Sequence, residues 1–301
     1  MEVRKALADF IARSGKSQAQ VAKEIGVSSA VISQYLSSSY KGDIEKTESQ
    51  IQAYLQIAEQ RLKNAAIAVY NPDTENAQKI LMVVSYAHRF SKMAMVYGDA
   101  GAGKTETLKR YAAKDASVVM VTANASCKTS RAVLHMIASA LGLHPTGTES
   151  AIMDLLIDRL SGTNRLIIID EADHLTLNAL QAVRNLFDVA NIGVILSGNE
   201  MTIYQMYVKR NSQATKFDQL RSRIGMKVKV SNQIFTYEEM ALIFPALASD
   251  CINELLKITR SYSLRTAINV CEYASLLAAS QNQAITGKII NLAFESAFRL
   301  S

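Results

Sequence analysis

The sequence MAMVYGDAGAGKT, residues 93–105, decides the fold of this chain. Its first five residues are mostly apolar and predict a buried strand, and the residues that follow Thr105 predict a helix. Between them lies the pattern G-x-x-x-x-G-K-T, which is the spacing of a phosphate-binding loop that joins a strand to a helix. Glycines let the backbone approach a phosphate without interference from a Cβ atom. The stretch therefore predicts an α/β domain that binds a nucleoside triphosphate.

Each part of this loop has an expected role toward the triphosphate. Backbone N–H groups of the loop and of the first helical turn would point at phosphate oxygens. Lys104 would reach the β- and γ-phosphates, and Thr105 would ligate Mg²⁺. A glycine- and alanine-rich turn between a strand and a helix is the simpler alternative, but it leaves the lysine and the hydroxyl without a role. The expected nucleotide-contacting residues are Gly98, Asp99, Ala100, Gly101, Ala102, Gly103, Lys104, Thr105 and Glu106.

Composition narrows the class of protein further. Of the 301 residues, 49% are hydrophobic and only three are proline, so the chain can bury a sizeable core. It contains neither a signal-peptide pattern nor an apolar run of about 18 residues, so we expect no membrane partner. The three scattered cysteines are typical of free thiols in a reducing cytoplasm and do not have the spacing of a metal site.

Four further apolar segments have the length of strands and alternate with helical patterns. They are residues 118–122, 166–170, 193–197 and 226–230. Together with residues 93–97 they predict a five-stranded, doubly wound parallel sheet. The strand at 166–170 ends in Asp170 and is followed by Glu171, which is the Walker B pattern: Asp170 would hold Mg²⁺, directly or through water, and Glu171 would polarise the attacking water.

Three polar residues outside the loop complete the expected site. Asn199 follows the strand at 193–197, where a sensor 1 residue would orient water near the γ-phosphate; a simple turn is the alternative. Arg223 precedes the last strand and is the first choice for an arginine finger supplied to a neighbouring subunit, with Arg221 second. Arg265 begins a later helix, where a sensor 2 arginine would reach the γ-phosphate; a surface arginine is the alternative.

Residues 1–66 predict a separate all-α helix-turn-helix domain. Gly26 separates two short helical patterns, and Ala22 is small where the two helices would cross. The second helix carries no Arg or Lys on its expected outer face, so weak or shape-tolerant DNA binding is favoured over base-specific readout. A helical hairpin used for packing is the alternative. The expected DNA contacts of this domain are Ser28, Ser29, Ser33 and Gln34. Ser28 would also cap the second helix.

The C-terminal part of the chain predicts a helical lid and a basic surface. Residues 236–301 contain four helical patterns without a strand signal, so the core is expected to span residues 67–235. The net charge is +6, and basic residues are concentrated between positions 201 and 229. Such a concentration favours an anionic partner, above all nucleic acid, although a solvated basic face is the alternative for any single lysine.

Taken together, the motifs resemble those of the Mu B family of phage transposition proteins, which are AAA+ ATPases. More distant similarity extends to the IstB and TnsC transposition ATPases and to helicase loaders. The resemblance rests on YKGD at 40–43, GDAGAGKTE at 98–106, IIIDEADHL at 167–175, LSGN at 196–199, SRI at 222–224 and LR at 264–265.

This resemblance implies an ATPase that uses ATP and Mg²⁺ and binds double-stranded DNA with little sequence preference. It implies ATP-dependent helical filaments of many copies on target DNA, delivery of that DNA to a DDE transposase, stimulation of strand transfer, and a part in target selection and immunity. Hydrolysis would be stimulated by DNA and by the transposase. The expected location is the bacterial host cytoplasm, in association with the nucleoid.

The phosphate loop departs from the usual pattern of the family. The loop reads DAGA between its outer glycines, where proline often occupies one position. The DNA contacts of the core lie outside the motifs, and our candidates there are Lys128 and Arg131, then Lys209 and Arg210. Two alternative functions use the same core: a helicase loader or replication initiator, and a helix-turn-helix transcriptional regulator switched by ATP.

Overall fold

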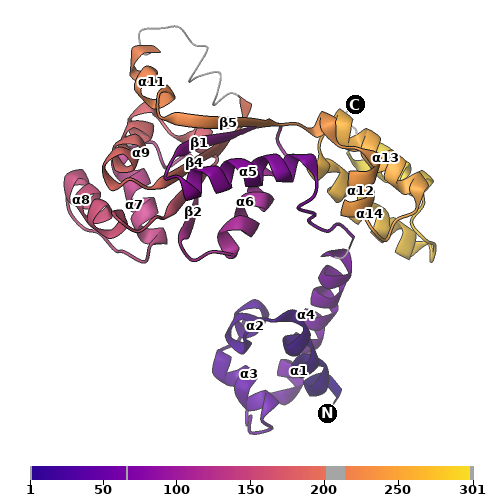
Figure 1. Ribbon diagram of the computed structural model, residues 1–301. Coiled ribbons are helices and arrows are strands. Elements are labelled where there is room, and N and C mark those ends of the chain that lie inside the picture. Colours follow the sequence, from indigo (N-terminus) through magenta and orange to yellow (C-terminus); the bar gives the residue numbers. More distant parts are fainter. Residues whose placement is uncertain (1, 66, 201–213, 299–301) are drawn as a thin grey trace. The chain divides into compact units, whose positions relative to one another are not determined.

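The computed structural model describes residues 2–65, 67–200 and 214–298 (Figure 1). The chain divides into two compact units, Met1–Ala68 and Val69–Ser301. Within the described ranges, no helix combines the length and the apolar character that crossing a membrane requires. Each unit has its own hydrophobic core.

The first unit is a small helical domain built around a helix-turn-helix pair. Its helices are α1 (Glu2–Ser14), α2 (Gln18–Ile25), α3 (Ser29–Leu36) and α4 (Ile44–Ala65). Gly26 ends α2 in the left-handed conformation, with φ +86°, and its N–H donates to the carbonyl of Ala22. The hydroxyl of Ser28 accepts the N–H of Val31 and so caps α3. Ala22 is only 1% exposed, which fits the close crossing that the sequence predicts.

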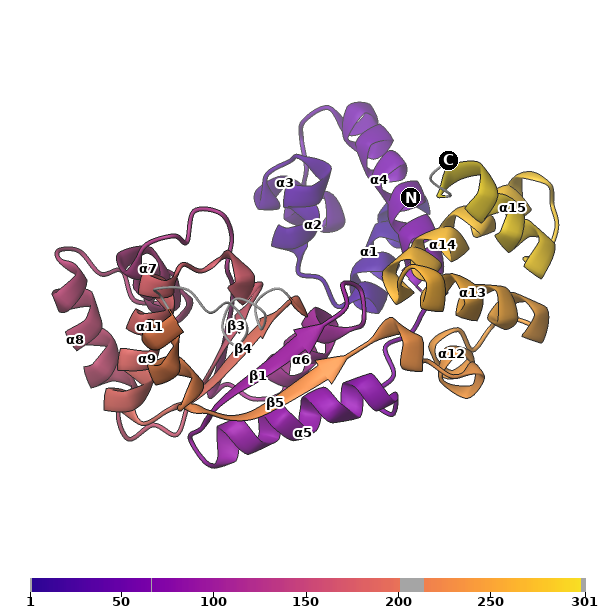
Figure 2. The same cartoon turned by 90° about the horizontal axis from the view of Figure 1, so that it is seen from above.

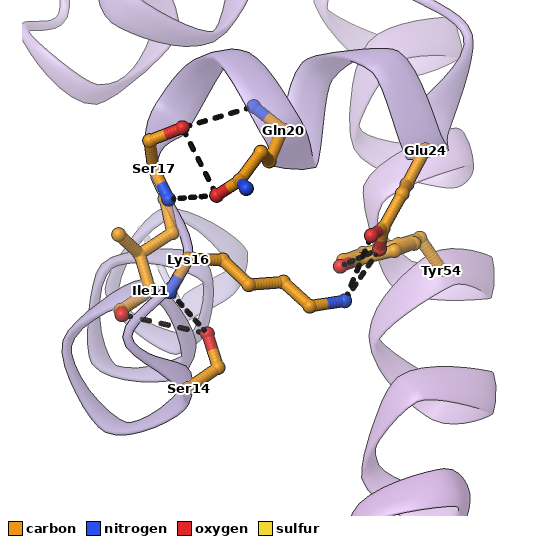
Figure 3. Close-up of polar contacts among 7 residues, drawn as sticks. All are labelled: Ile11, Ser14, Lys16, Ser17, Gln20, Glu24 and Tyr54. Atoms are coloured by element: carbon orange, nitrogen blue, oxygen red, sulfur yellow. Dashed lines mark hydrogen bonds and ion pairs between the residues drawn. The ribbon is translucent and has the colours of Figure 1, made fainter. Parts of the chain in front are cut away.

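Two polar networks fasten α2, one at its start and one near its end (Figure 3). Ser17 and Gln20 form a reciprocal capping box at the N-terminus of α2. The ammonium of Lys16 pairs with Glu24 at 2.7 Å, and the hydroxyl of Tyr54 donates to the same carboxylate at 2.8 Å. These contacts tie the α1–α2 connection and α2 to α4. The aliphatic and aromatic core beneath them consists mainly of Leu7, Phe10, Val21, Ile32, Tyr35 and Ile51.

The second unit contains a five-stranded sheet in the order β2-β3-β4-β1-β5, and all of its strand pairs are parallel. The strands are β1 (Met93–Gly98), β2 (Val118–Thr122), β3 (Leu166–Asp170), β4 (Gly193–Gly198) and β5 (Ile224–Val230). The predicted α/β class is therefore confirmed, with strand bounds within two residues of those expected. Because the strands are parallel, their carboxyl ends meet at one edge of the sheet.

Helices cover both faces of this sheet (Figures 1 and 2). One face packs against α5 (Glu75–Arg89) and α6 (Lys104–Ala113). The other packs against α7 (Ser130–Ala140), α8 (Glu149–Leu160) and α9 (Leu177–Ala190). Strand residues alternate between the two sides: Ile168 contributes to the first core, whereas Ile167 and Ile169 contribute to the second. Burial on both faces explains the continuous apolar run of the central strands.

A short connection leads from β5 into a group of helices. Helix α11 (Ala214–Arg221) precedes β5, and two 3₁₀ turns lie at Ala172–His174 and Asn232–Ile234. The helices after the sheet are α12 (Tyr237–Ile243), α13 (Ser249–Ser261), α14 (Leu264–Ser280) and α15 (Gly287–Ala297). They pack around buried residues such as Leu255 and Val270. Ser263, the residue before α14, lies beside the loop that follows β1.

Candidate nucleotide-binding site

The loop after β1 has a backbone that only glycine accommodates at two points. Gly98 has φ +131°, and a Cβ atom there would lie 2.0 Å from the carbonyl oxygen of Val230 at the end of β5. Gly101 has φ +72°, and its Cβ would lie 2.9 Å from the Cβ of Ser263, which precedes α14. The loop therefore lies in contact with both the neighbouring strand and the start of a lid helix. Its bare backbone then runs into the N-terminus of α6, a geometry suited to anions.

Lys104, the first residue of α6, folds back over this loop. Its ammonium donates to the carbonyl of Gly98 at 2.9 Å and to that of Asp99 at 2.8 Å. Burial lowers the pKa of Lys104, and the carboxylates of Asp170 and Glu171 oppose that shift. The ammonium of Lys104 therefore lies within reach of any anion that binds in the loop.

Asp170 joins three elements at the carboxyl edge of the sheet. It is 2% exposed, and its two carboxylate oxygens accept from the hydroxyl of Thr105 at 2.6 Å and from that of Ser197 at 2.7 Å. Ile169 pairs with Leu196, so the residues that follow them in β3 and β4 lie side by side. A carboxylate and a hydroxyl brought together in this way are oxygen ligands of the kind that Mg²⁺ prefers, so the residues present fit that ion.

Asn199 and the acidic residues after β3 lie next to one another. The side-chain amide of Asn199 donates to the carboxylate of Asp173 at 2.8 Å, and its backbone N–H donates to the other oxygen at 3.3 Å. Glu171 is exposed and has φ +55°, a left-handed conformation that non-glycine residues adopt at a cost. That backbone turn directs the chain away from the buried Asp170 immediately after the strand. The structure thus brings the predicted Walker B and sensor 1 residues into one region.

The two predicted arginines occupy opposite ends of the second unit. Arg265, in the first turn of α14, is exposed, and its Cβ lies 3.0 Å from where a Cβ on Gly101 would be. Arg223 precedes Ile224, which pairs with Met93 at the start of β1, so it lies at the edge of the sheet away from the phosphate loop. Its guanidinium donates to Asp188 at 2.7 Å. Arg265 is therefore near the loop of its own chain, and Arg223 is not.

The predicted DNA-contacting residues are distributed over both units. Lys128 and Arg131 are exposed beside the start of α7. Lys209 and Arg210 lie outside the described residues. In the first unit, the exposed side chains on and just before α3 include those of Ser28, Ser29, Ser33 and Gln34. In the second unit, Arg221, the second choice for the finger, pairs with Asp218 at 3.0 Å.

Several residues of the site could not be identified from their local sequence. Ser197 shares the carboxylate of Asp170, and Asp173 holds Asn199. Asp99 lies in the predicted loop, but its carboxylate accepts from the hydroxyl of Ser231 and from the N–H of Asn232, both at 2.8 Å. Asp99 thus fastens the loop to the connection between β5 and the lid. Of these residues, only Ser197 could have been suspected from the sequence, because it lies at the end of the strand beside Walker B.

Substitution of Gly98 tests the close contact between the loop and β5. Gly98→Ala places a Cβ atom against the Val230 carbonyl and strains the backbone, so the second unit should lose roughly 2–6 kcal/mol of unfolding free energy. Gly103→Ala is the matched control, because its φ is also positive, at +95°, but no atom lies within 4 Å of the added Cβ. It should lose only roughly 1–2 kcal/mol. Chemical denaturation without nucleotide measures both, and an equal loss would contradict the described contact.

Comparison with solved structures supports the fold. The chain resembles the protein in "Structure of Drosophila ORC bound to DNA" with a TM-score of 0.54 and 16% sequence identity. The match covers 78% of this chain and 65% of the solved chain, just under two thirds of its length. At this identity the likeness shows a shared architecture and nothing further.

Sequence comparison identifies the family. Residues 88–206 match the AAA domain family. The chain is 32% identical to the "Mu-like prophage FluMu DNA transposition protein B" of Haemophilus influenzae over 225 residues, 74% of this chain and 78% of that protein. It is 29% identical to the "ATP-dependent target DNA activator B" of Escherichia phage Mu over 236 residues, 76% and 73% of the two chains. The chain therefore belongs to the Mu-type DNA transposition protein B family of AAA ATPases, as its motifs predicted.

Proposed function

We propose that this protein is an ATP-dependent, largely sequence-nonspecific DNA-binding ATPase that assembles on target DNA and delivers it to a transposase. The observation that carries the proposal is the contact between Thr105 and Asp170, which joins the phosphate loop to the Walker B strand. The printed name of the phage Mu relative, a target DNA activator, supports DNA as the partner.

Within one subunit, the residues around the loop divide the work of binding and hydrolysing ATP. The ammonium of Lys104, which donates to two loop carbonyls, would donate to β- and γ-phosphate oxygens instead, and Thr105 and Asp170 would hold Mg²⁺. The ion, when bound, neutralises phosphate charge. Glu171 polarises the attacking water, and Asn199 orients it while Asp173 keeps the amide in place.

The position of Arg223 supports an active site shared between two copies. It lies at the opposite edge of the sheet from its own phosphate loop, so it serves the nucleotide of a neighbouring subunit. Arg265 serves the nucleotide of its own chain from the start of α14. Such sharing makes bound ATP part of the contact between copies, and it favours ATP-dependent filaments.

The remaining roles follow the same division of the chain. Residues 1–66 form the helix-turn-helix domain, 67–235 the nucleotide-binding core and 236–301 the lid. Lys128 and Arg131 contact the DNA backbone from the core, together with Lys209 and Arg210. The filament presents DNA to a DDE transposase and stimulates strand transfer. The transposase in turn stimulates hydrolysis, and release after hydrolysis contributes to target selection and immunity. These steps take place in the host cytoplasm, on the nucleoid.

Two substitutions separate ATP binding from hydrolysis. Lys104→Ala should abolish ATP-dependent DNA retention, because the loop loses its only ammonium. Glu171→Gln should retain ATP and DNA but release phosphate about 10²-fold or more slowly. Glu254→Gln, the same chemical change at an ion pair with Lys257 in the lid, is the control. Phosphate release and DNA sedimentation measure these effects. Full DNA retention by Lys104→Ala, or normal turnover by Glu171→Gln, would contradict the assigned roles.

A mixing experiment tests the shared site. Arg223→Ala alone should hydrolyse ATP slowly, because no subunit supplies a finger to its neighbour. Lys104→Ala alone should be inactive for a different reason, since its own loop is defective. In a mixture, a Lys104→Ala subunit can supply Arg223 to the intact loop of an Arg223→Ala subunit, so DNA-dependent turnover should partly recover. Absence of recovery over the sum of the two separate proteins would argue against a finger supplied in trans.

A further inference from the structure

A buried asparagine lies in the connection between β5 and the lid. Asn232 is 3% exposed and begins the 3₁₀ turn Asn232–Ile234, immediately after Ser231. Its backbone N–H donates to the carboxylate of Asp99 in the phosphate loop. The roles assigned above for ATP binding and hydrolysis do not use its side chain, yet buried amides in proteins are almost always hydrogen-bonded, so its partners are informative.

The side-chain amide of Asn232 joins two backbone groups that belong to different parts of the second unit. Its Nδ2 donates to the carbonyl of Ala100, in the phosphate loop, at 3.0 Å. Its Oδ1 accepts the N–H of Leu264, the first residue of α14, at 3.2 Å. The first N–H groups of a helix have no partner within the helix, so this contact also supplies a cap to α14. One amide therefore spans the distance from the loop to the lid.

Further contacts around this amide join the two parts. Gly101 lies against Ser263, so the loop and the start of α14 are in direct contact. The guanidinium of Arg260 donates to the carbonyl of Phe235, and the side chain of Gln233 donates to the carbonyl of Arg260. These bonds hold α13 on the same connection. A shift of the Ala100 carbonyl must therefore move α14 or break the bridge.

We propose that Asn232 is a positioning residue that transmits occupation of the phosphate loop to the lid, and so sets the position of Arg265. This inference rests on the proposed binding of ATP at the loop. When phosphates enter, the loop carbonyls give up the ammonium of Lys104, and the Ala100 carbonyl stays paired only if Asn232 follows it. Because the same amide holds the N–H of Leu264, the helix that carries Arg265 follows as well.

A nearby asparagine offers a matched control. Asn76 is 2% exposed, and its side chain makes two hydrogen bonds to the backbone of Ser231, at 2.9 and 3.2 Å. It thus steadies the same connection with the same chemistry but contacts neither the loop nor α14 through those bonds. Both Asn76→Ala and Asn232→Ala lose buried hydrogen bonds, but only Asn232→Ala also loses the bridge between the loop and α14.

The test follows hydrogen exchange of the backbone amides at 264–267 in the full chain, with and without saturating ATP. In the unaltered protein, ATP should slow this exchange about tenfold or more, because the start of α14 becomes fixed. Asn232→Asp keeps an acceptor for Leu264 but loses the donor to Ala100, so α14 stays capped while the ATP effect falls to about twofold or less. Asn232→Ala should also lose the effect, and Asn76→Ala should retain it.

Binding of a fluorescent ATP analogue, measured in parallel, separates this inference from the proposed function. Protection at 264–267 that persists in ATP-bound Asn232→Asp would overturn the inference, as would its absence in the ATP-bound unaltered protein. Failure of the unaltered protein to bind ATP would instead overturn the proposed function on which the inference rests. Equal loss of the ATP effect in Asn76→Ala would show that the connection as a whole, and not the bridge, is responsible.

Discussion

The contact between Gly98 and the Val230 carbonyl is the constraint on which the site depends. It brings the end of β1 so close to the end of β5 that no side chain fits between them. The N–H of Asp99 then donates to the same carbonyl, and the Asp99 carboxylate is held by the two residues that follow β5. The phosphate loop is thus supported from the strand beside it as well as from its own strand.

Charge explains why this loop suits a metal-bound triphosphate better than a bare one. Asp170 lies beside the loop with both carboxylate oxygens already accepting hydrogen bonds, and Glu171 and Asp173 follow it. These carboxylates oppose the fall in the pKa of Lys104 that burial causes, and they would repel a polyphosphate that arrived without a counterion. Mg²⁺, which Thr105 and Asp170 would hold, would offset that repulsion, so we expect nucleotide binding and metal binding to be coupled.

The five parallel strands could be predicted because each is a short apolar run between helical patterns, but their order in the sheet, β2-β3-β4-β1-β5, was not predicted. Strand β5 begins two residues earlier than predicted, since Gly225 interrupts its apolar pattern while Ile224 still pairs with Met93. The polar supports of the site were not predictable. Asn232 meets Ala100 across 132 positions and Asp188 meets Arg223 across 35, and neither pairing leaves a local signal.

Occupation of the phosphate loop by ATP is the proposed trigger for assembly of the protein on DNA. Electron microscopy of the purified chain with duplex DNA tests it most directly, in parallel samples with ATP and Mg²⁺, with ADP and Mg²⁺, and without nucleotide. We expect regular filaments on DNA with ATP and none in the other two samples. Equally abundant filaments without nucleotide, or bare DNA in the presence of ATP, would contradict it.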